Sequence, residues 1–246
     1  MRIFVINLPH RTDKRAEILA QGEKYHLPLE IIEAVNGNAL SDDELKKIVF
    51  DYPDCCMTKG VIGCALSHLK IYKKVIDENI PIALILEDDA ILHEDLEEAL
   101  RQIESLDRNE SPAVYLLSSH YYKPGPLRRL NGKYALHEFM DGSQGHGYVV
   151  NRKAAESLYE NLQPIKWEAD KWYYFQQMKL VSAYCVVPHI VGVNGVAEIS
   201  DLYAERALQN KKRRKYLNKL RNVVSRRQQL KKLFWKIFKR PFAKKS

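Results

Sequence analysis

The feature that most constrains the fold of this chain is an apolar run that ends abruptly in three acids. Residues 82–86 read Ile-Ala-Leu-Ile-Leu, and Glu87, Asp88 and Asp89 follow directly. An apolar run of this length predicts a central strand buried on both faces. The acids then stand at the carboxyl end of that strand, which is where ligands bind in open α/β sheets.

Two explanations fit this acidic cluster. Three carboxylates at the end of a buried strand repel one another, so a cation or hydrogen-bond donors must compensate their charge. Mg²⁺ and Mn²⁺ favour such oxygen ligands and keep open positions for the phosphates of a nucleotide. Ordinary loop acids that cap the next helix are the alternative.

Short apolar strands alternate with amphipathic helices along most of the chain, which predicts an α/β fold. Helices are expected over residues 12–25, 41–49, 60–79, 95–106, 152–162 and 167–178. Further strands are expected over residues 3–8, 29–35, 114–118, 147–150 and 183–187. Residues 121–141 predict no more than loops and a hairpin.

Charge divides the chain into two parts. Of its 39 Lys and Arg residues, 17 lie in residues 206–246, which contain no acid. Residues 1–205 therefore carry 22 basic and 31 acidic residues, a net charge of −9. We interpret residues 1–205 as one α/β domain and residues 206–246 as a basic helical tail.

The tail combines its positive charge with apolar and aromatic residues such as Phe234, Trp235 and Phe238. This combination is typical of a helix that lies on an anionic membrane surface. Nucleic-acid binding is a competing explanation, which the aromatic cluster disfavours. A helix packed on the domain is a third, and it fits residues 203–220 better than the last 20 residues.

Four cysteines without C-x-x-C repeats indicate a reducing compartment, because they form neither a disulfide framework nor a zinc motif. The first apolar run is too short for a signal peptide, and no run approaches the roughly 18 apolar residues of a spanning helix. We therefore expect a cytoplasmic protein, peripheral to the inner face of the cytoplasmic membrane.

Basic and aromatic residues supply further candidates for binding. Arg11 and Arg15 follow the first strand, four residues apart, and suit a diphosphate or simply a solvated helix face. His68 could face a ligand or be a hydrogen-bonded core histidine. Asp170 lies between Trp167 and Trp172, which fits either a sugar-binding site with a base or an amphipathic helix with an aromatic core.

Taken together, these segments resemble glycosyltransferase family 25, the group that includes bacterial lipooligosaccharide galactosyltransferases and the collagen galactosyltransferase domain. The similarity covers roughly residues 2–190. It rests on the segments Val5–Leu8 with Arg11, Asp13 and Arg15, Glu33–Gly37, Gly63–His68, Ala83–Ala90, Gly147–Ala154, and Asp170. One departure is the segment Lys59-Gly60-Val61-Ile62, where the family often has a glutamate.

The resemblance implies a GT-A type fold, a Rossmann-like mixed sheet flanked by helices, and transfer from a nucleotide sugar with inversion. It implies Glu87 and Asp89 as ligands of Mn²⁺ or Mg²⁺, with His189 as a third ligand, and Asp170 as the catalytic base. It implies contacts to the donor from Asn7, Leu8, Arg11, Arg15, Ala34, Ser67, His68 and Asp88. It implies contacts to the acceptor from Tyr148 and Trp167.

The function expected from this resemblance is transfer of a hexose, galactose from UDP-galactose, in β linkage onto a lipid-linked lipooligosaccharide or lipopolysaccharide core. No nucleic-acid partner is expected. A metal-dependent nucleotidyltransferase or phosphohydrolase is the alternative enzyme class, since it also needs acids at a strand end. A non-enzymatic protein that binds through the basic tail is the alternative outside enzymes.

Overall fold

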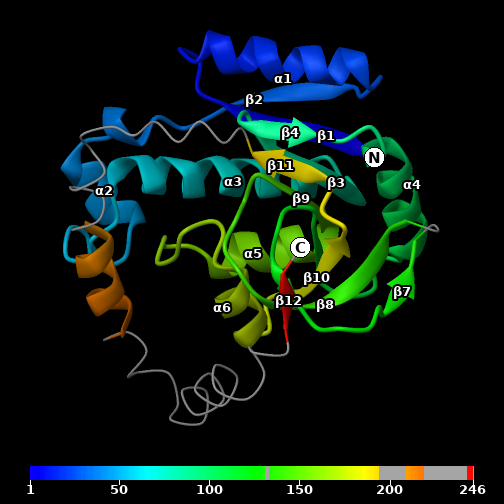
Figure 1. Ribbon diagram of the computed structural model, residues 1–246. Coiled ribbons are helices and arrows are strands. Elements are labelled where there is room, and N and C mark those ends of the chain that lie inside the picture. The colour runs from blue at the N-terminus through cyan, green and yellow to red at the C-terminus, as the bar shows by residue number, and fades with distance from the viewer. Residues whose placement is uncertain (131–132, 194–208, 219–242, 246) are drawn as a thin grey trace.

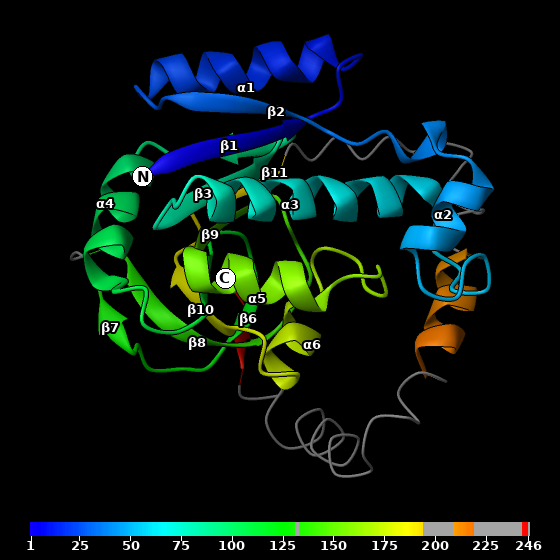
Figure 2. The same cartoon turned by 180° about the vertical axis from the view of Figure 1, so that it is seen from behind.

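The computed structural model describes residues 1–130, 133–193, 209–218 and 243–245. Figures 1 and 2 show the arrangement from opposite sides. In chain order the named elements are β1 (Arg2–Asn7), α1 (Thr12–Lys24), β2 (Leu29–Glu33), the 3₁₀ turn η1 (Gly37–Ala39), α2 (Asp42–Ile48), α3 (Lys59–Asp77), β3 (Ile82–Glu87), β4 (Ala90–Leu92), α4 (Leu96–Leu106), β5 (Ala113–Leu116), β6 (Tyr121–Tyr122), β7 (Arg128–Arg129), β8 (Ala135–Asp141), β9 (Gly147–Asn151), α5 (Arg152–Asn161), α6 (Trp172–Gln177), β10 (Ser182–Val187), β11 (Val191–Val193) and β12 (Lys244–Lys245).

A mixed sheet of ten strands organises the described part of the chain. Its order is β12-β6-β8-β10-β5-β9-β3-β1-β2, with β7 paired to β8, and β4 and β11 form a separate two-stranded sheet. Strands β2, β1 and β3 run parallel to one another, and β5 and β10 form a second parallel pair. Strand β9 lies between β3 and β5, antiparallel to both. The predicted α/β class with a mixed sheet is confirmed.

Helices cover both faces of the sheet because its inner strands are apolar on both sides. In β1, Phe4 and Ile6 pack in a core with α3 and α5, whereas Ile3 and Val5 pack in a second core with α1 and α4. This alternation follows from the two-residue period of a strand. Figure 2 shows α3 and α5 side by side on the first face.

Capping side chains fix the starts of the two helices that precede the acidic strand. Ser41 and Glu44 form a capping box at the start of α2. The hydroxyl of Thr58 accepts a hydrogen bond from the Val61 amide at the start of α3. Helix α3 therefore begins at Lys59, one residue before the predicted start at Gly60.

The structure corrects the predicted helix over residues 167–178, because α6 covers only Trp172–Gln177. The segment before this helix is held by a tertiary contact instead, in which Arg213 donates to the Lys166 carbonyl at 2.7 Å. Residues 121–141, predicted as loops and a hairpin, hold three strands, two of them only two residues long.

The described part of the tail packs on the domain. Residues 209–218 are helical and lie beside the segment that follows α2, where Gln209 donates to the Cys56 carbonyl at 3.3 Å and Tyr216 donates to Asp51 at 3.1 Å (Figure 1). Strand β12 pairs with β6.

The predicted domain boundary at residue 205 and most of the predicted membrane-binding segment lie outside the described residues. Among the helices that the structure does describe, none combines the length and apolar character needed to traverse a lipid bilayer.

Candidate functional site

The carboxyl ends of three parallel strands meet at one edge of the sheet. Asn7 ends β1 and Glu87 ends β3, with Ile6 and Glu87 opposite each other in the register. Beyond β2, the Ala34 amide donates to the Asn7 carbonyl at 2.9 Å. Ligands of open α/β sheets bind at this edge, as the position of the acidic run predicted.

Glu87, Asp89 and His146 form the centre of this edge. His146 Nδ1 lies 3.2 Å from Asp89 Oδ1 and 3.5 Å from Glu87 Oε2. Because β9 runs antiparallel to β3, the residue before β9 arrives beside the last residue of β3, and the Glu87 amide donates to the His146 carbonyl at 3.0 Å. Sequence reasoning missed His146, although it directly precedes the predicted strand at residues 147–150.

The protonation of this centre follows from its contacts. Burial raises the pKa of Glu87, but the neighbouring imidazoles of His146 and His68, both 3.5 Å from its carboxylate, outweigh burial and lower that pKa below the usual range. Hydrogen bonds to Asp89 and Glu87 raise the pKa of His146 to about 10. The His146 imidazolium therefore offsets part of the negative charge of the two carboxylates.

Asp88 pairs with Asn7 and shares Lys14 with Asp89. Asn7 Nδ2 donates to Asp88 Oδ2 at 2.8 Å, and Lys14 Nζ lies 3.5 Å from Asp88 Oδ1 and 4.0 Å from Asp89 Oδ2. Helix α1 thus brings the cation of Lys14 to the acids. Arg15 is exposed and Arg11 pairs with Asp13 at 2.9 Å, and the predicted contacts of both arginines to the donor stay predictions.

Leu8 and Ala34, predicted to contact the donor, lie beside the same edge. Both are partly buried. The Leu8 carbonyl accepts from the Arg11 amide at 2.8 Å at the start of α1. Their donor contacts stay predictions.

Two residues predicted to contact the substrates are buried, one on β9 and one on α3. Tyr148 of β9, predicted to bind the acceptor, is fully buried, and its hydroxyl lies 2.7 Å from both His68 Nδ1 and the Tyr72 hydroxyl. Ser67 of α3, predicted to bind the donor, is also fully buried, and its hydroxyl accepts a hydrogen bond from the Val35 amide and donates one to the Gly63 carbonyl. The contacts of these two residues to acceptor and donor stay predictions.

Asp170 approaches the same centre from the loop before α6. A Cβ added to Gly145 would stand 2.9 Å from Glu87 Oε1 and 3.8 Å from the Asp170 Cβ, so both carboxylate residues lie against Gly145. Burial raises the pKa of Asp170; Lys171, at 3.6 Å, opposes this, while Glu168 and Glu87 add to it. A carboxylate with a raised pKa that faces the acids suits proton transfer.

Trp167, predicted to contact the acceptor, is half-buried and stacks on Tyr174 with ring centroids 4.8 Å apart. Its predicted contact to the acceptor stays a prediction.

His189 is not part of the group formed by Glu87, Asp89 and His146, among the residues that the structure describes. It is exposed, in the connection between β10 and β11. Its role as a third metal ligand stays a prediction, and the structure offers His146 in that position instead.

The donor set of this centre fits a divalent cation. Ligand atoms of Glu87, Asp89 and His146 all lie within 4.8 Å of one another. Two carboxylates and one imidazole suit Mn²⁺ or Mg²⁺ with open positions for phosphate oxygens. The absence of a side chain at Gly145 leaves Glu87 its space, because a Cβ there would crowd Oε1.

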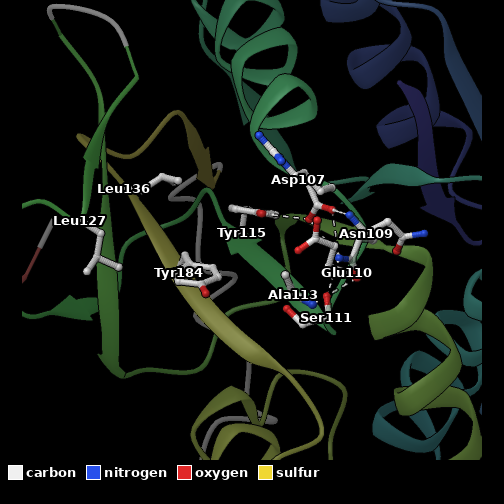
Figure 3. Close-up of a pocket in the computed structure, with 11 residues that line it drawn as sticks. Asp107, Asn109, Glu110, Ser111, Ala113, Tyr115, Leu127, Leu136 and Tyr184 are labelled. Carbon is white, nitrogen blue, oxygen red and sulfur yellow. Dashed lines mark hydrogen bonds between the residues drawn. The ribbon is translucent and has the colours of Figure 1, made fainter.

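A pocket of about 210 Å³ lies away from this centre, at the other end of β5 and β9 (Figure 3). Its main polar groups bind one another: Asp107 accepts from the Tyr115 hydroxyl at 2.9 Å and from Asn151 Nδ2 at 3.0 Å. These contacts tie the end of α4 to the sheet, which is a structural role.

Comparison with known proteins agrees with this geometry. The profile of Glycosyltransferase family 25 (LPS biosynthesis protein) matches residues 1–173, more than two thirds of the chain. The chain belongs to glycosyltransferase family 25.

Relatives within family 25 include human procollagen galactosyltransferase 2, 32% identical over 167 residues, or 63% of this chain and 27% of that protein. Zebrafish procollagen galactosyltransferase 1 is 26% identical over 168 residues, 63% of this chain and 28% of its own length. The chain thus spans about a quarter of the length of these relatives. Mouse inactive glycosyltransferase 25 family member 3 is 28% identical over 109 residues, 41% of this chain and 18% of its own length.

The family 25 match includes every residue of the centre described above. Glu87, Asp89, His146 and Asp170 fall inside residues 1–173, whereas His189 and the basic tail fall outside. One relative is named inactive, so membership of the family does not by itself establish that a protein is active. The evidence for activity is therefore the geometry of the site.

Proposed function

We propose that this protein transfers galactose from UDP-galactose, with inversion and therefore in β linkage, onto a lipid-linked lipooligosaccharide or lipopolysaccharide core. The observation that carries the proposal is the meeting of Glu87, Asp89 and His146 at the strand ends, with Asp170 against the same glycine. Transfer from a nucleotide sugar needs charged groups that bind the diphosphate and a separate base that deprotonates the acceptor. This edge of the sheet offers candidates for the two tasks in Glu87, Asp89 and His146 and in Asp170.

Support for the sugar and the acceptor comes from the family. The human and zebrafish relatives are named procollagen galactosyltransferases, which favours galactose as the transferred sugar. The family description names LPS biosynthesis, which favours a bacterial glycolipid core over collagen.

The residues of the proposed donor site have different roles in binding the diphosphate. Glu87, Asp89 and His146 would hold Mn²⁺ or Mg²⁺, which neutralises charge that develops on the departing diphosphate. Lys14 lies beside Asp88 and Asp89, where its ammonium group can bind a phosphate oxygen. Asn7 orients Asp88 through the 2.8 Å hydrogen bond.

Asp170 is the proposed base that takes the proton of the attacking hydroxyl. Inversion requires attack from the face opposite the leaving diphosphate, and therefore a base outside the phosphate-binding group. The raised pKa of Asp170 brings its basicity closer to that of a group that exchanges protons near neutral pH. Trp167 and Tyr174 offer aromatic faces on which a sugar ring of the acceptor packs.

A survey of donors tests the proposed reaction. Purified protein receives UDP-galactose, UDP-glucose or their N-acetyl forms with a lipooligosaccharide acceptor, with Mn²⁺ and then with chelator, and UDP release is measured. We expect chelator-sensitive release from UDP-galactose and a β-linked product by NMR. Turnover of nucleoside triphosphates without any sugar transfer would instead identify a nucleotidyltransferase or phosphohydrolase.

Two substitutions separate the metal site from the base. We expect Asp170→Asn to lower transfer by at least about 100-fold, the usual contribution of a general base. Asp89→Ala should also lower transfer strongly, because the metal would lose a ligand. Only Asp89→Ala should weaken Mn²⁺-dependent UDP binding, measured by calorimetry. Asp43→Asn, an exposed acid on α2, serves as the control and should match the wild type. Equal UDP affinity in all four proteins would rule out Asp89 as a metal ligand.

We further propose that the tail beyond residue 218 binds the inner face of the cytoplasmic membrane, where such an acceptor is assembled. The described helix at 209–218 packs on the domain, so a truncation after residue 218 keeps those contacts. It removes the remaining basic segment together with the short pairing of β12 with β6. The full chain should sediment with anionic vesicles and not with neutral ones, and the truncated chain with neither. Equal sedimentation of both proteins would contradict a membrane role for this segment.

A further inference from the structure

A second group of metal-ligating side chains stands against Glu87, on the side away from His146. Cys64 and His68 lie four residues apart on α3, and this spacing places both side chains on one face of the helix. His68 Nε2 is 3.5 Å from Glu87 Oε1, and Cys64 Sγ is 4.0 Å from the same oxygen. All three ligand atoms lie within 4.8 Å of one another.

His68 is aimed into this group. Its side chain is 1% exposed, and Nδ1 is held at 2.7 Å from the Tyr148 hydroxyl. Its Nε2 is buried and makes no hydrogen bond of normal geometry to any group in the described residues. In metal sites, a histidine binds the metal through one ring nitrogen while a hydrogen bond to the other ring nitrogen fixes the orientation of the ring. His68 has this arrangement.

The spacing of the three atoms approaches that of a tetrahedral zinc site. With Zn–S of about 2.3 Å and Zn–N and Zn–O of about 2.0 Å, tetrahedral angles put ligand atoms about 3.3–3.6 Å apart. The Nε2 to Oε1 distance already matches, and the Sγ to Oε1 distance needs a change of about 0.5 Å, which rotation of the half-buried Cys64 side chain can supply.

Glu87 keeps this group separate from the proposed donor-metal site. Oε1 faces Cys64 and His68, whereas Oε2 faces His146. The donor sets also differ in chemistry, because a thiolate with an imidazole selects soft or borderline cations and the carboxylates around Asp89 select hard ones.

We propose that Cys64, His68 and Glu87 form a zinc site, distinct from the Mn²⁺ or Mg²⁺ site and joined to it through the Glu87 carboxylate. Binding deprotonates the Cys64 thiol and releases its proton to solvent, with Zn²⁺ taking the place of that proton on sulfur. Three protein ligands leave a fourth position open to water or to an anion.

Zinc binding by the full chain tests the proposal without any sugar transfer, so its failure and the failure of the proposed reaction are distinguishable. Metal-free wild type, Cys64→Ser and Cys56→Ser are titrated with Zn²⁺ against a chromophoric chelator, in excess Mg²⁺ to occupy the hard site. Cys56 is the matched control, because it is a half-buried thiol outside this group. We expect Cys64→Ser to bind Zn²⁺ at least about 10-fold more weakly, and Cys56→Ser to bind like the wild type.

Cobalt spectra supply a second readout that reports the ligand itself. Co²⁺ bound by a thiolate gives a charge-transfer absorption that oxygen and nitrogen ligands do not give. This band should appear in the wild type and in Cys56→Ser and vanish in Cys64→Ser. The proposal is overturned if Cys64→Ser binds Zn²⁺ as tightly as the wild type, or if the band survives in Cys64→Ser.

Discussion

The buried side chain of Arg213 gives a prediction whose magnitude follows from its contacts. Only 7% of this side chain is exposed, and its guanidinium donates to both oxygens of Glu168 at 3.0 and 3.3 Å. It also donates to the carbonyls of Cys55 and Lys166 at 2.8 and 2.7 Å. One side chain of the helix at residues 209–218 thus holds the loop that leads to Asp170.

Arg213→Ala should therefore be far more destabilising than a surface substitution. It leaves Glu168, itself 17% exposed, without its main partner. Removing one partner of a buried ion pair costs about 3–5 kcal/mol, and we expect the lower end because Lys171 lies 4.0 Å from Glu168. At a slope of about 2 kcal/mol/M, a loss of about 3 kcal/mol lowers the urea midpoint by about 1.5 M.

Urea unfolding followed by circular dichroism measures this loss, with Arg214→Ala as the control. Arg214 has the same charge on the same helix and is exposed. A double-mutant cycle with Glu168→Gln should return a coupling energy of about 1–3 kcal/mol, as expected for groups in contact. If Arg213→Ala unfolds within about 0.5 kcal/mol of Arg214→Ala, the buried pair contributes nothing and the reasoning is refuted.

Three further predictions concern the site and its supports. Gly145→Ala should lower Mn²⁺ affinity by about 10-fold without lowering stability, because its Cβ would stand 2.9 Å from Glu87 Oε1 and displace the whole carboxylate, including the Oε2 atom that faces His146; unchanged affinity by calorimetry would contradict this. Ser67→Ala should cost about 1–3 kcal/mol in urea unfolding, because the Val35 amide loses its acceptor; a loss below about 0.5 kcal/mol would contradict it. Burial lowers the pKa of His120 to about 4, below the value of about 6.5 in the unfolded chain. As the pH falls from about 6.5 to about 4, the unfolded state binds a proton that the folded state does not bind, so the folded state loses stability over this range. The free energy of unfolding should therefore fall between about pH 7 and pH 5 by about 2 kcal/mol less in His120→Asn than in the wild type. An equal fall in both proteins would show that His120 does not cause this loss.

The elements predicted well from the sequence were those whose side chains repeat with a clear period. The strand at residues 82–86 and the long helix α3 agree with their patterns to within about one residue at most ends. Strands β4, β6, β7 and β11 have two or three residues each, too few to show a period, and tertiary pairing alone defines them.

Candidate site residues that lie together in one segment were named from the sequence. Those that only the tertiary fold brings to the site were missed. Glu87 and Asp89 follow one strand, so local sequence identified them. His146 joins them through the antiparallel pairing of β9 with β3, a tertiary fact without a local signal. Lys14 rather than Arg15 faces the acids because a helix turns by about 100° per residue, so a shift of one position changes the face.

The position of β9 between β3 and β5 has a consequence for synthesis of the protein. While the ribosome is still making residues 88–146, β1, β2 and β3 can already pair, but the other edge of β3 has no neighbour. That unpaired edge belongs to the most apolar strand of the chain, and such edges recruit strands from other molecules. The nascent chain is therefore most prone to aggregate until residue 151 has emerged, and substitutions that slow the docking of β9 should lower soluble yield even where they leave the finished fold equally stable.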